Sequence, residues 1–318
     1  MGRTPDGDGQ VTTGPEISVV MSVHNGAATL PATLSSVLTQ DGCDYEFVVI
    51  DDGSNDDTAA ILDEFARRYP RLRVTHQPNT GLTRALIRGC ELATGEFIAR
   101  QDAGDISLPG RLAAQLSFLR TRPQAVMTAC AVEFIGPKNE PLFELCRPML
   151  DLDSGLREST IATVSGPPHH GATMFRRQLY ARVGGYRAPF LVAQDLDLWL
   201  RLAEEGECLG MDQVLYRARL EVGSISSRSR DQQFRMAELA LACRRARASA
   251  GDDECTLGPT ETPALPKGRL TRTERARFHY FVGSCLRQRD RRAAKAYYGA
   301  AFRENPLHFK ALMNWVFS

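Results

Sequence analysis

Short apolar runs alternate with helical segments through the first hundred residues, and most of these runs end in a polar turn. Three of them are 17–23 (ISVVMSV), 46–50 (EFVVI) and 97–100 (FIAR). Their apolar residues are contiguous rather than alternating, which is typical of strands buried on both faces of a sheet. Because the intervening segments have helical spacing, the pattern predicts successive βαβ units and an α/β fold with a mainly parallel sheet.

Polar residues mark where the intervening helices begin. Thr29 is expected to cap the first helix, and Asp56 or Asp57 the second. A further strand over 72–75 and a helix over 83–92 complete this part of the pattern.

Polar side chains follow three of the predicted strands. His24, Asp52 and Asp102 lie just past the strands, at the carboxyl edge where α/β sheets bind ligands. Asp102 and Asp105 enclose the small residues Ala103 and Gly104, which leave room for a bulky ligand. The alternative for Asp105 is a structural one, capping the helix that follows Pro109.

This edge lacks the common phosphate-binding motifs. The chain has no GxGxxG after its first strand and no GKS or GKT, which excludes a dinucleotide fingerprint and a P-loop. Carboxylates beside a phosphate would repel it, so a phosphate ligand here requires a divalent cation between them.

The second half is predicted to hold a strand over 125–134, a helix over 151–163, and a pair of histidines, His169 and His170, before another strand. Asp195 is placed at the start of a helix, where it could simply be a cap. Helices are then expected over 229–249, 272–289 and 291–304 and at the C-terminus. Phe278, Phe281 and Val282 are predicted to face Tyr297, Ala301 and Phe302.

Charge and cysteine content restrict the functional classes. Between Arg228 and Lys310 there are eighteen Lys and Arg and nine Asp and Glu, which indicates either a basic tail or helices with solvated arginine faces. The eight cysteines are scattered without CxxC spacing, so we expect reduced thiols in a cytoplasmic protein. The sequence contains neither an apolar run long enough to span a bilayer nor a signal-peptide pattern.

Four blocks together carry a family resemblance. In order they are ISVVMSVHNG, FVVIDDGSNDDT, NTGLTRALIRG and ATGEFIARQDAGDISLPGRL. Their order and spacing resemble the nucleotide-binding half of family 2 glycosyltransferases, which have the GT-A fold. The resemblance implies transfer of a sugar from a nucleoside diphosphate, usually UDP, with inversion at the anomeric carbon.

The resemblance also implies roles for individual residues. Ser22 and His24 would line the base pocket, Asp52 would accept a hydrogen bond from uracil, and Asp102 would hold the ribose or a metal. Arg84 would contact the base or the diphosphate, unless it is an ordinary surface arginine. The nucleotide-sugar contacts are then Ser22, His24, Asn25, Asp52, Arg84 and Asp102.

The sequence departs from the family pattern at two acidic positions. Gly104 replaces the second Asp of the Asp-x-Asp motif, so Asp105 is expected to join Asp102 in binding Mn²⁺ or Mg²⁺. Gln194 replaces the usual Glu before Asp195, which keeps the implied role of general base. His170 and Gln194 are expected on the acceptor side.

We therefore expect a disordered segment 1–15, a nucleotide-sugar-binding half 16–123, an acceptor half 124–227 and a helical region 228–318 with a linker near 250–268. The predicted function is an inverting transfer to a glycan or lipid-linked acceptor in cell-surface polysaccharide synthesis, with no nucleic acid among its partners. The predicted location is the cytoplasm, with peripheral contact at the inner membrane face. The alternatives are a non-catalytic nucleotide-sugar-binding protein and a sugar nucleotidyltransferase, which would need a Gly-rich basic loop after the first strand.

Overall fold

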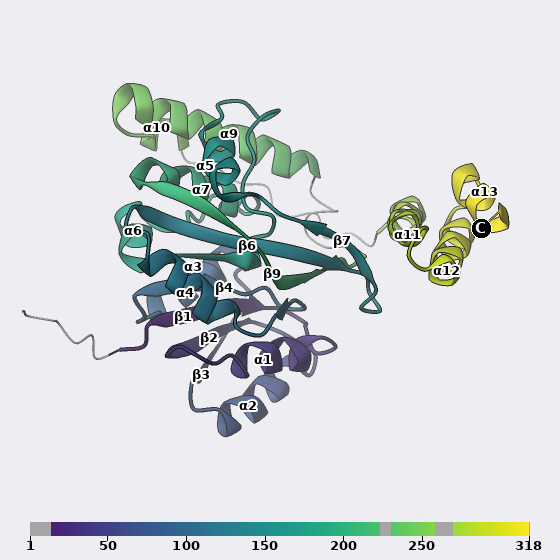
Figure 1. Cartoon of the computed structure of the whole chain (residues 1–318), viewed down its shortest axis with the longest axis horizontal. Coiled ribbons are helices and arrows are strands. Elements are labelled where there is room, and N and C mark those ends of the chain that lie inside the picture. The colour runs from purple at the N-terminus through teal and green to yellow at the C-terminus, as the bar shows by residue number, and fades with distance from the viewer. Residues whose placement is uncertain (1–13, 223–229, 258–269, 318) are drawn as a thin grey trace, which may run out of the picture.

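The computed structural model describes residues 14–222, 230–257 and 270–317. Within them, nine strands form one sheet in the order β3-β2-β1-β4-β8-β6-β9-β5, and β7 pairs with β6 beside this path. Helices cover the sheet, and a separate group of helices lies beyond one end of it (Figure 1). The predictions for 1–13 and for most of the linker near 250–268 lie outside the described residues.

The strands have the following bounds: β1 Ile17–Val23, β2 Tyr45–Asp52, β3 Leu72–Gln77, β4 Phe97–Arg100, β5 Ile106–Ser107, β6 Ala125–Ile135, β7 Pro141–Leu145, β8 Thr173–Arg176 and β9 Glu207–Arg219. The helices are α1 Leu30–Leu38, α2 Thr58–Arg68, α3 Leu82–Leu92, α4 Arg111–Arg120, α5 Met149–Arg157, α6 Arg177–Arg182, α7 Gln194–Glu205, α9 Arg230–Ala250, α10 Glu254–Leu257, α11 Arg272–Leu286, α12 Arg291–Glu304 and α13 Phe309–Phe317, with a 3₁₀ turn η1 at His170–Ala172.

The N-terminal half of the sheet is parallel, as the sequence predicts. β1 pairs in parallel with β2 and β4, and β2 with β3. The sheet then becomes mixed, because β8 runs antiparallel to both β4 and β6. The α/β fold class is confirmed, and the parallel pairing that the sequence predicts is concentrated in β3-β2-β1-β4.

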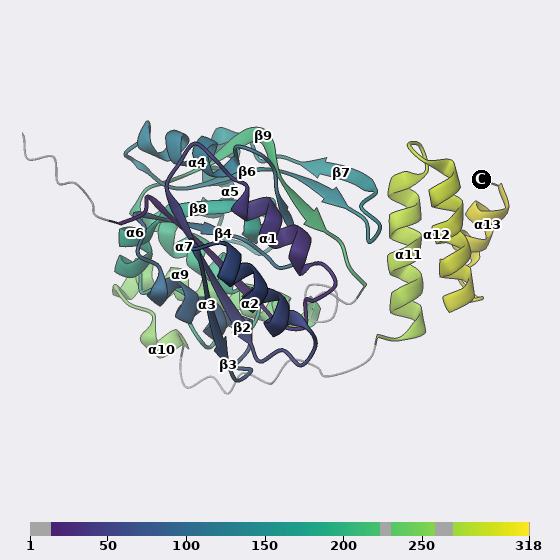
Figure 2. The ribbon, with the colours of Figure 1, turned by 90° about the horizontal axis from the view of Figure 1, so that it is seen from below.

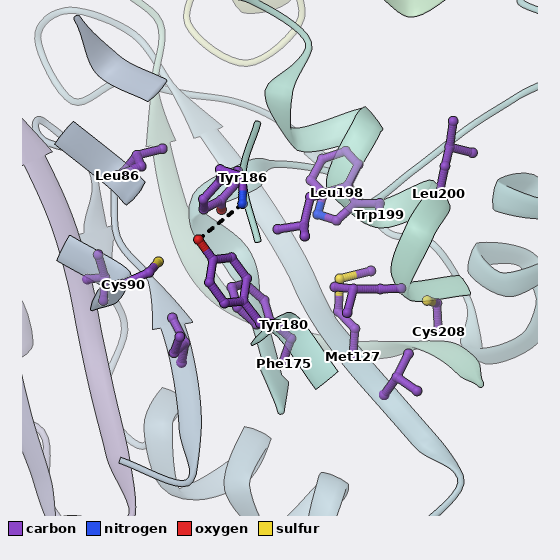
Figure 3. Close-up of a cluster of buried hydrophobic side chains, with 14 of the residues drawn as sticks. Leu86, Cys90, Met127, Phe175, Tyr180, Tyr186, Leu198, Trp199, Leu200 and Cys208 are labelled. Atoms are coloured by element: carbon purple, nitrogen blue, oxygen red, sulfur yellow. Dashed lines mark hydrogen bonds between the residues drawn. The ribbon is translucent and has the colours of Figure 1, made fainter. Parts of the chain in front are cut away.

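Both faces of β1, β2 and β4 are buried, which explains why these strands read as continuous apolar runs, whereas most residues of the edge strand β3 are exposed or partly exposed. Val20 and Ile98 point into a core formed with α3, α5, α7 and α9. Their neighbours Val19 and Ala99 point to the opposite face, where α1, α2 and α4 pack. Figure 3 shows the first core, in which the Tyr180 hydroxyl accepts a hydrogen bond from the Tyr186 backbone at 3.1 Å.

Several local predictions hold only in part. Thr29 and Asp57 occupy the N-cap positions of α1 and α2, as predicted, but their side chains make no capping hydrogen bond, and Asp56 accepts from Thr58 N at 3.0 Å instead. The helix predicted over 151–163 ends at Arg157, because the chain turns back to place Ser165 N on the Gly155 carbonyl at 3.0 Å.

The edges of the second half also differ from the prediction. β7 and the long strand β9 are not predicted from sequence, and in the first half α4 begins at Arg111, two residues after Pro109. β9 lacks a contiguous apolar run, since most of its second half is partly exposed. Its position follows instead from parallel pairing with β6 over most of that strand.

The C-terminal helices form two separate groups. α9 packs on the body, where Ala240 and Leu241 join the core around α7. α11–α13 lie beyond the β6–β7 hairpin in both views (Figures 1 and 2). Leu142 of β7 packs with Val282 of α11, and Tyr297 donates to Glu140 at 2.8 Å. The pairing of α11 with α12 is as predicted for Val282 and Tyr297.

Phe281 does not face α12 as predicted. Its side chain is 45% exposed, and its ring contacts Phe143 of β7 edge to face at 6.2 Å between ring centroids.

Two further sequence expectations concern thiols and membranes. The cysteines whose side chains are described are free thiols. No helix in the described ranges has both the length and the apolar content needed to cross a bilayer.

Gly95 precedes β4 at a point where the chain crosses β1 closely. A Cβ at this position would lie 2.6 Å from the Ile17 carbonyl carbon and from Ser18 N. We expect Gly95→Ala to lower the free energy of unfolding by about 1–3 kcal/mol, the usual cost of overpacking. Denaturant unfolding measures the loss.

Gly14→Ala is the control for this variant, since a Cβ at Gly14 has only a 3.9 Å contact with the Thr94 carbonyl oxygen. We expect that change to stay within about 0.5 kcal/mol of the parent. An equal effect of both variants would contradict the close crossing of β1.

Candidate active site

The parallel pairing brings three of the predicted site residues to one edge. β1 lies between β2 and β4 and runs parallel to both. His24 follows β1, Asp52 ends β2 and Asp102 follows β4. They therefore lie at the carboxyl edge of the sheet, where they form two groups of contacts.

Asp52 holds the loop that leads into α3. Its carboxylate accepts from Gln77 Nε2 at 2.8 Å, from Thr80 N at 2.9 Å and Oγ1 at 3.0 Å, and from Gly81 N at 2.8 Å. The residue is 2% exposed. Three of these bonds end on Oδ1 and one on Oδ2, so the end of β3 and the loop after it engage both oxygens of the carboxylate. Since each oxygen offers about two acceptor positions, a base-binding role for Asp52 would use the remaining position on Oδ2.

His24 joins the loops after β1 and β2. Its Nδ1 lies 3.0 Å from the Asp52 carbonyl oxygen and 3.1 Å from Asn79 Nδ2. Asn25 has a positive φ of 55°, which Asn tolerates better than most residues. Its Oδ1 accepts from Asn55 N at 2.8 Å. The sequence analysis did not single out Asn79, although it begins the NTG block.

The second group lies past β4. Asp102, Asp105 and His169 place three ligand atoms within 4.8 Å of one another. His169 Nδ1 is 3.9 Å from Asp102 Oδ2 and 3.6 Å from Asp105 Oδ2. His169 Nδ1 also accepts from Gly171 N at 3.1 Å, so binding of a cation through this nitrogen would replace that hydrogen bond. Asp102 and Asp105 were predicted to act together, whereas His169 was not assigned to the site.

Gly104 explains why the second carboxylate comes from Asp105. Its φ is +98°, a conformation that an Asp with its Cβ adopts only with strain. Its amide donates to Thr33 Oγ1 of α1 at 3.1 Å. This turn carries the chain onward so that Asp105, held by Tyr216 Oη at 3.0 Å and Arg219 N at 2.8 Å, lies beside Asp102.

The two carboxylates have opposite pKa shifts. Burial raises the pKa of Asp105 to about 6, although His169 opposes this rise and Asp102 adds to it. Burial also acts to raise the pKa of Asp102, but Arg100, the two histidines and Arg111 together outweigh it and the net shift is downward. Arg100 Nη2 donates to Asp102 Oδ1 at 2.8 Å. At neutral pH, Asp102 is therefore firmly ionised, and Asp105 loses its proton near pH 6.

Asp195 lies in the first turn of α7, two residues after a strained residue. Ala193 has a φ of 55°, which is rare for a residue with a Cβ. Burial raises the pKa of Asp195, and the negative charge of Asp102 raises it further. Since that charge acts on Asp195, the two carboxylates lie within electrostatic range of each other. Gln194 beside it is 7% exposed.

Asp197, two residues later, has a structural role. It is 1% exposed and pairs with Arg187 and with Arg201, whose Nη2 lies 2.6 Å from Asp197 Oδ2. It is therefore a buried supporting residue rather than a helix-surface one. This leaves Asp195 as the carboxylate of α7 that is available for chemistry.

His170 is buried behind the site rather than beside the carboxylates. Its Nε2 lies 2.6 Å from the Tyr186 hydroxyl and accepts from Arg100 Nε at 3.3 Å. Burial and the nearby Arg100 lower the pKa of His170 to about 3, so it is neutral at physiological pH. Of the two remaining predicted contacts, Ser22 is partly buried near the end of β1, and Arg84 is exposed in the first turn of α3.

The donor set fits a divalent cation. Two carboxylates and one imidazole nitrogen are ligands that Mn²⁺ and Mg²⁺ accept, with carboxylate oxygen preferred by both. The cluster is partly open to solvent, because the Asp102 side chain is 32% exposed and that of His169 26%. Asp102, Asp105 and His169 are therefore the residues that would hold Mn²⁺ or Mg²⁺.

Comparison with known proteins agrees with this geometry. A sequence model described as Glycosyl transferase family 2 matches residues 18–184, more than half of the chain. EpsE of Bacillus subtilis is 29% identical over 276 residues, which cover 84% of this chain and 96% of EpsE. The amylovoran biosynthesis glycosyltransferase AmsE of Erwinia amylovora is 29% identical over 216 residues, covering 66% of this chain and 79% of AmsE.

Two solved structures share the fold. S. aureus TarS 1-349 in complex with UDP-GlcNAc gives a TM-score of 0.57 at 17% identity, covering 94% of this chain and 89% of that one. The mannosyltransferase PcManGT from Pyrobaculum calidifontis, in complex with GDP-Man and Mn²⁺, gives a TM-score of 0.55 at 21% identity, with 94% and 78% covered. At these identities the likeness establishes the fold.

Asp105 provides a pH test of the site. Its pKa of about 6 lies above the unfolded value near 3.8, so the folded state binds this proton more tightly. The resulting stability is complete below about pH 4 and is lost as the pH rises through 6. The difference between the two pKa values corresponds to about 3 kcal/mol.

We therefore expect Asp105→Asn, in buffer with EDTA, to match the parent near pH 4 and to exceed its free energy of unfolding by up to about 3 kcal/mol at pH 7.5. Urea unfolding across this range measures the difference. A variant that is less stable than the parent by the same amount at both pH values would contradict a buried carboxylate that ionises near pH 6.

Proposed function

The chain belongs to glycosyl transferase family 2 and is a glycosyltransferase of GT-A fold, and from this premise we propose that it moves a sugar from a nucleoside diphosphate, UDP by preference, to a hydroxyl group with inversion. The acceptor is a glycan or a lipid-linked glycan in cell-surface polysaccharide synthesis. The observation that carries the proposal is the Asp102–Asp105–His169 cluster at the carboxyl edge, within electrostatic range of Asp195.

The donor is assigned to the N-terminal half, residues 16–123. The loops after β1 and β2 would contact the base through Ser22, His24 and Asn25. Asp52 supports these loops by holding the segment before α3. Arg84, exposed in the first turn of α3, is the proposed cation for the base or the diphosphate.

The diphosphate would lie at the Asp102–Asp105–His169 cluster. A divalent cation bound there would neutralise the charge that develops on the departing diphosphate. Without such a cation, two carboxylates would repel the donor. Gly104 stands where the family usually has a second Asp. The site still offers ligands, because Asp105 Oδ2 and His169 Nδ1 lie 3.6 Å apart. This favours a catalytic protein over a binding protein with a degenerate site.

The acceptor is assigned to the second half, residues 124–227, on the side of Gln194, whereas the buried His170 would support the site through its contacts with Arg100 and Tyr186. Asp195 would take the proton of the attacking hydroxyl group as its oxygen bonds the anomeric carbon. The bond from that carbon to the diphosphate oxygen breaks at the same time, and the nucleoside diphosphate leaves. The raised pKa of Asp195 suits this role, because a carboxylate with a higher pKa is a stronger base.

Asp195→Asn should abolish transfer and preserve nucleotide binding. Loss of a general base typically costs about 10²–10⁴-fold in turnover. We expect a loss of this size in a coupled assay of nucleoside diphosphate release, with UDP affinity within about threefold of the parent by calorimetry.

Asp151→Asn is the matched control, since Asp151 also lies in the first turn of a helix, α5, and is exposed. It should leave turnover unchanged. Full turnover by Asp195→Asn would remove that residue as the base, while loss of UDP affinity in the same variant would assign it to the donor side instead.

A second test addresses the cation. Mn²⁺ should tighten UDP binding at pH 7.5, because a cation held by Asp102, Asp105 and His169 would offset the negative charge of the diphosphate. His169→Ala and Asp102→Asn should each remove most of this enhancement, whereas His24→Ala should reduce UDP affinity equally with and without Mn²⁺. Calorimetric titrations of UDP into the parent and the three variants, each in Mn²⁺ and in EDTA, give the eight affinities. Equal affinity of the parent in both buffers would exclude the cluster as a diphosphate site.

A further inference from the structure

The terminal helix α13 presents an apolar stripe to solvent. Phe309, Met313 and Val316 follow one another at i, i+4 and i+7 and so share one face. They are 68%, 41% and 56% exposed, and Leu307 just before the helix is 91% exposed. Exposed apolar residues are common singly, whereas four of this size on one short segment mark an interaction surface.

The opposite face of α13 is fixed to α12, which determines where the stripe points. Ala311 is fully buried, and the Trp315 ring stacks on Phe302 with 6.0 Å between ring centroids. Trp315 also covers Gly299, where a Cβ would lie 3.0 Å from its Nε1. Because Phe309 follows α12 closely and Trp315 contacts its middle, α13 runs back along α12 with the stripe outward.

The helices around this stripe are strongly basic. Residues 270–317 contain ten Lys and Arg and three Asp and Glu, a net charge of +7, which leaves −6 for the rest of the chain of net charge +1. Arg292 and Lys295 lie at helical spacing with Gly299, so they continue the side of α12 on which α13 packs. Lys310 lies within α13 itself and is exposed.

The stripe is also remote from the catalytic body. In Figures 1 and 2, α11 lies beside the β6–β7 hairpin, and α12 and α13 follow further out. The hairpin contacts α11 and α12 through the cluster of Leu142, Val282 and Tyr297. Among the described residues, no contact of the body covers Phe309 or Val316, which is consistent with their exposure.

We propose that α13 and the basic side of α12 form a docking surface for an anionic lipid bilayer. An apolar stripe beside Lys and Arg is the combination that inserts at such an interface, with the cations on acidic headgroups. A second copy that docks through the same face is disfavoured, because it would present the same net charge of +7 to this surface. The contact would bring the enzyme to a lipid-linked acceptor, and this use of it rests on the proposed function. The contact with the bilayer itself does not.

The test is flotation of the full chain with vesicles of phosphatidylcholine alone or with 30% phosphatidylglycerol. We expect binding to the anionic vesicles and its loss in 0.5 M NaCl, because salt screens the basic residues. Phe309→Ser should weaken binding about tenfold, as expected for a large apolar side chain that leaves the lipid. Arg292→Glu with Lys295→Glu should weaken it more strongly, at about fivefold for each charge removed.

Leu150→Ser is the matched control, because Leu150 on α5 is 69% exposed, as Phe309 is 68% exposed. It should not change flotation. UDP affinity is measured on every variant, so that failure of the nucleotide site is seen separately from failure of the docking surface. Absence of flotation with anionic vesicles, equal weakening by Leu150→Ser, or a dimer in solution that Phe309→Ser disrupts would each overturn the proposal.

Discussion

The site depends on two guanidinium groups that are buried beneath it. Arg100 and Arg111 are both fully buried. Arg111 donates to the carbonyl oxygens of Arg100 at 2.6 Å and Gly171 at 2.8 Å, and its guanidinium lies over the Tyr216 ring. Since a buried charge is tolerated only when it is well hydrogen-bonded, these bonds fix the end of β4 against η1 and β9. The loops that carry Asp102, Asp105 and His169 come from these elements. The cluster is therefore held in place before any ligand binds.

The same cations set the ionisation of the site. Arg100 pairs directly with Asp102 and helps to keep its pKa low, whereas burial raises the pKa of Asp105 to about 6, although a hydroxyl and a backbone amide donate to it. The site thus combines the negative charge of Asp102, which is present throughout the physiological pH range, with that of Asp105, which appears as the pH rises through about 6. A bound cation would be attracted by both charges at neutral pH. Arg100 also contributes to the low pKa of His170, after burial, which keeps that ring neutral. Because His170 is neutral, it adds no positive charge to that of Arg100.

The sequence predicts the parallel half well and the site only in part. Contiguous apolar runs such as ISVVMSV identify strands buried on both faces, because that burial removes the polar alternation. β9 is missed, since its pairing with β6 is non-local and half of it is partly exposed. Asp102 and Asp105 are recognisable as neighbours on one loop. His169 is not, because 64 residues separate it from Asp105 and only the β4–β8 pairing brings them together. The hydrogen bonds that Asp52 accepts are likewise not visible in the local sequence, because their donors lie at the end of β3 and in the loop that follows it.

The β6–β7 hairpin joins the site to the outer helices in a fixed geometry. Arg219 of β9 donates its backbone amide to Asp105 and its guanidinium to Asn139 at the hairpin turn. A series of ring contacts also leads from His169 through Phe134 and Phe143 to Phe281 of α11, with centroid separations of 6.1, 4.7 and 6.2 Å. Packed rings of this kind resist bending, because close-packed interiors deform little. If α13 lies on a bilayer, the hairpin therefore determines how far the Asp102–Asp105–His169 cluster lies from the lipid headgroups. That distance would select acceptors by the length of glycan between the lipid and the reacting hydroxyl.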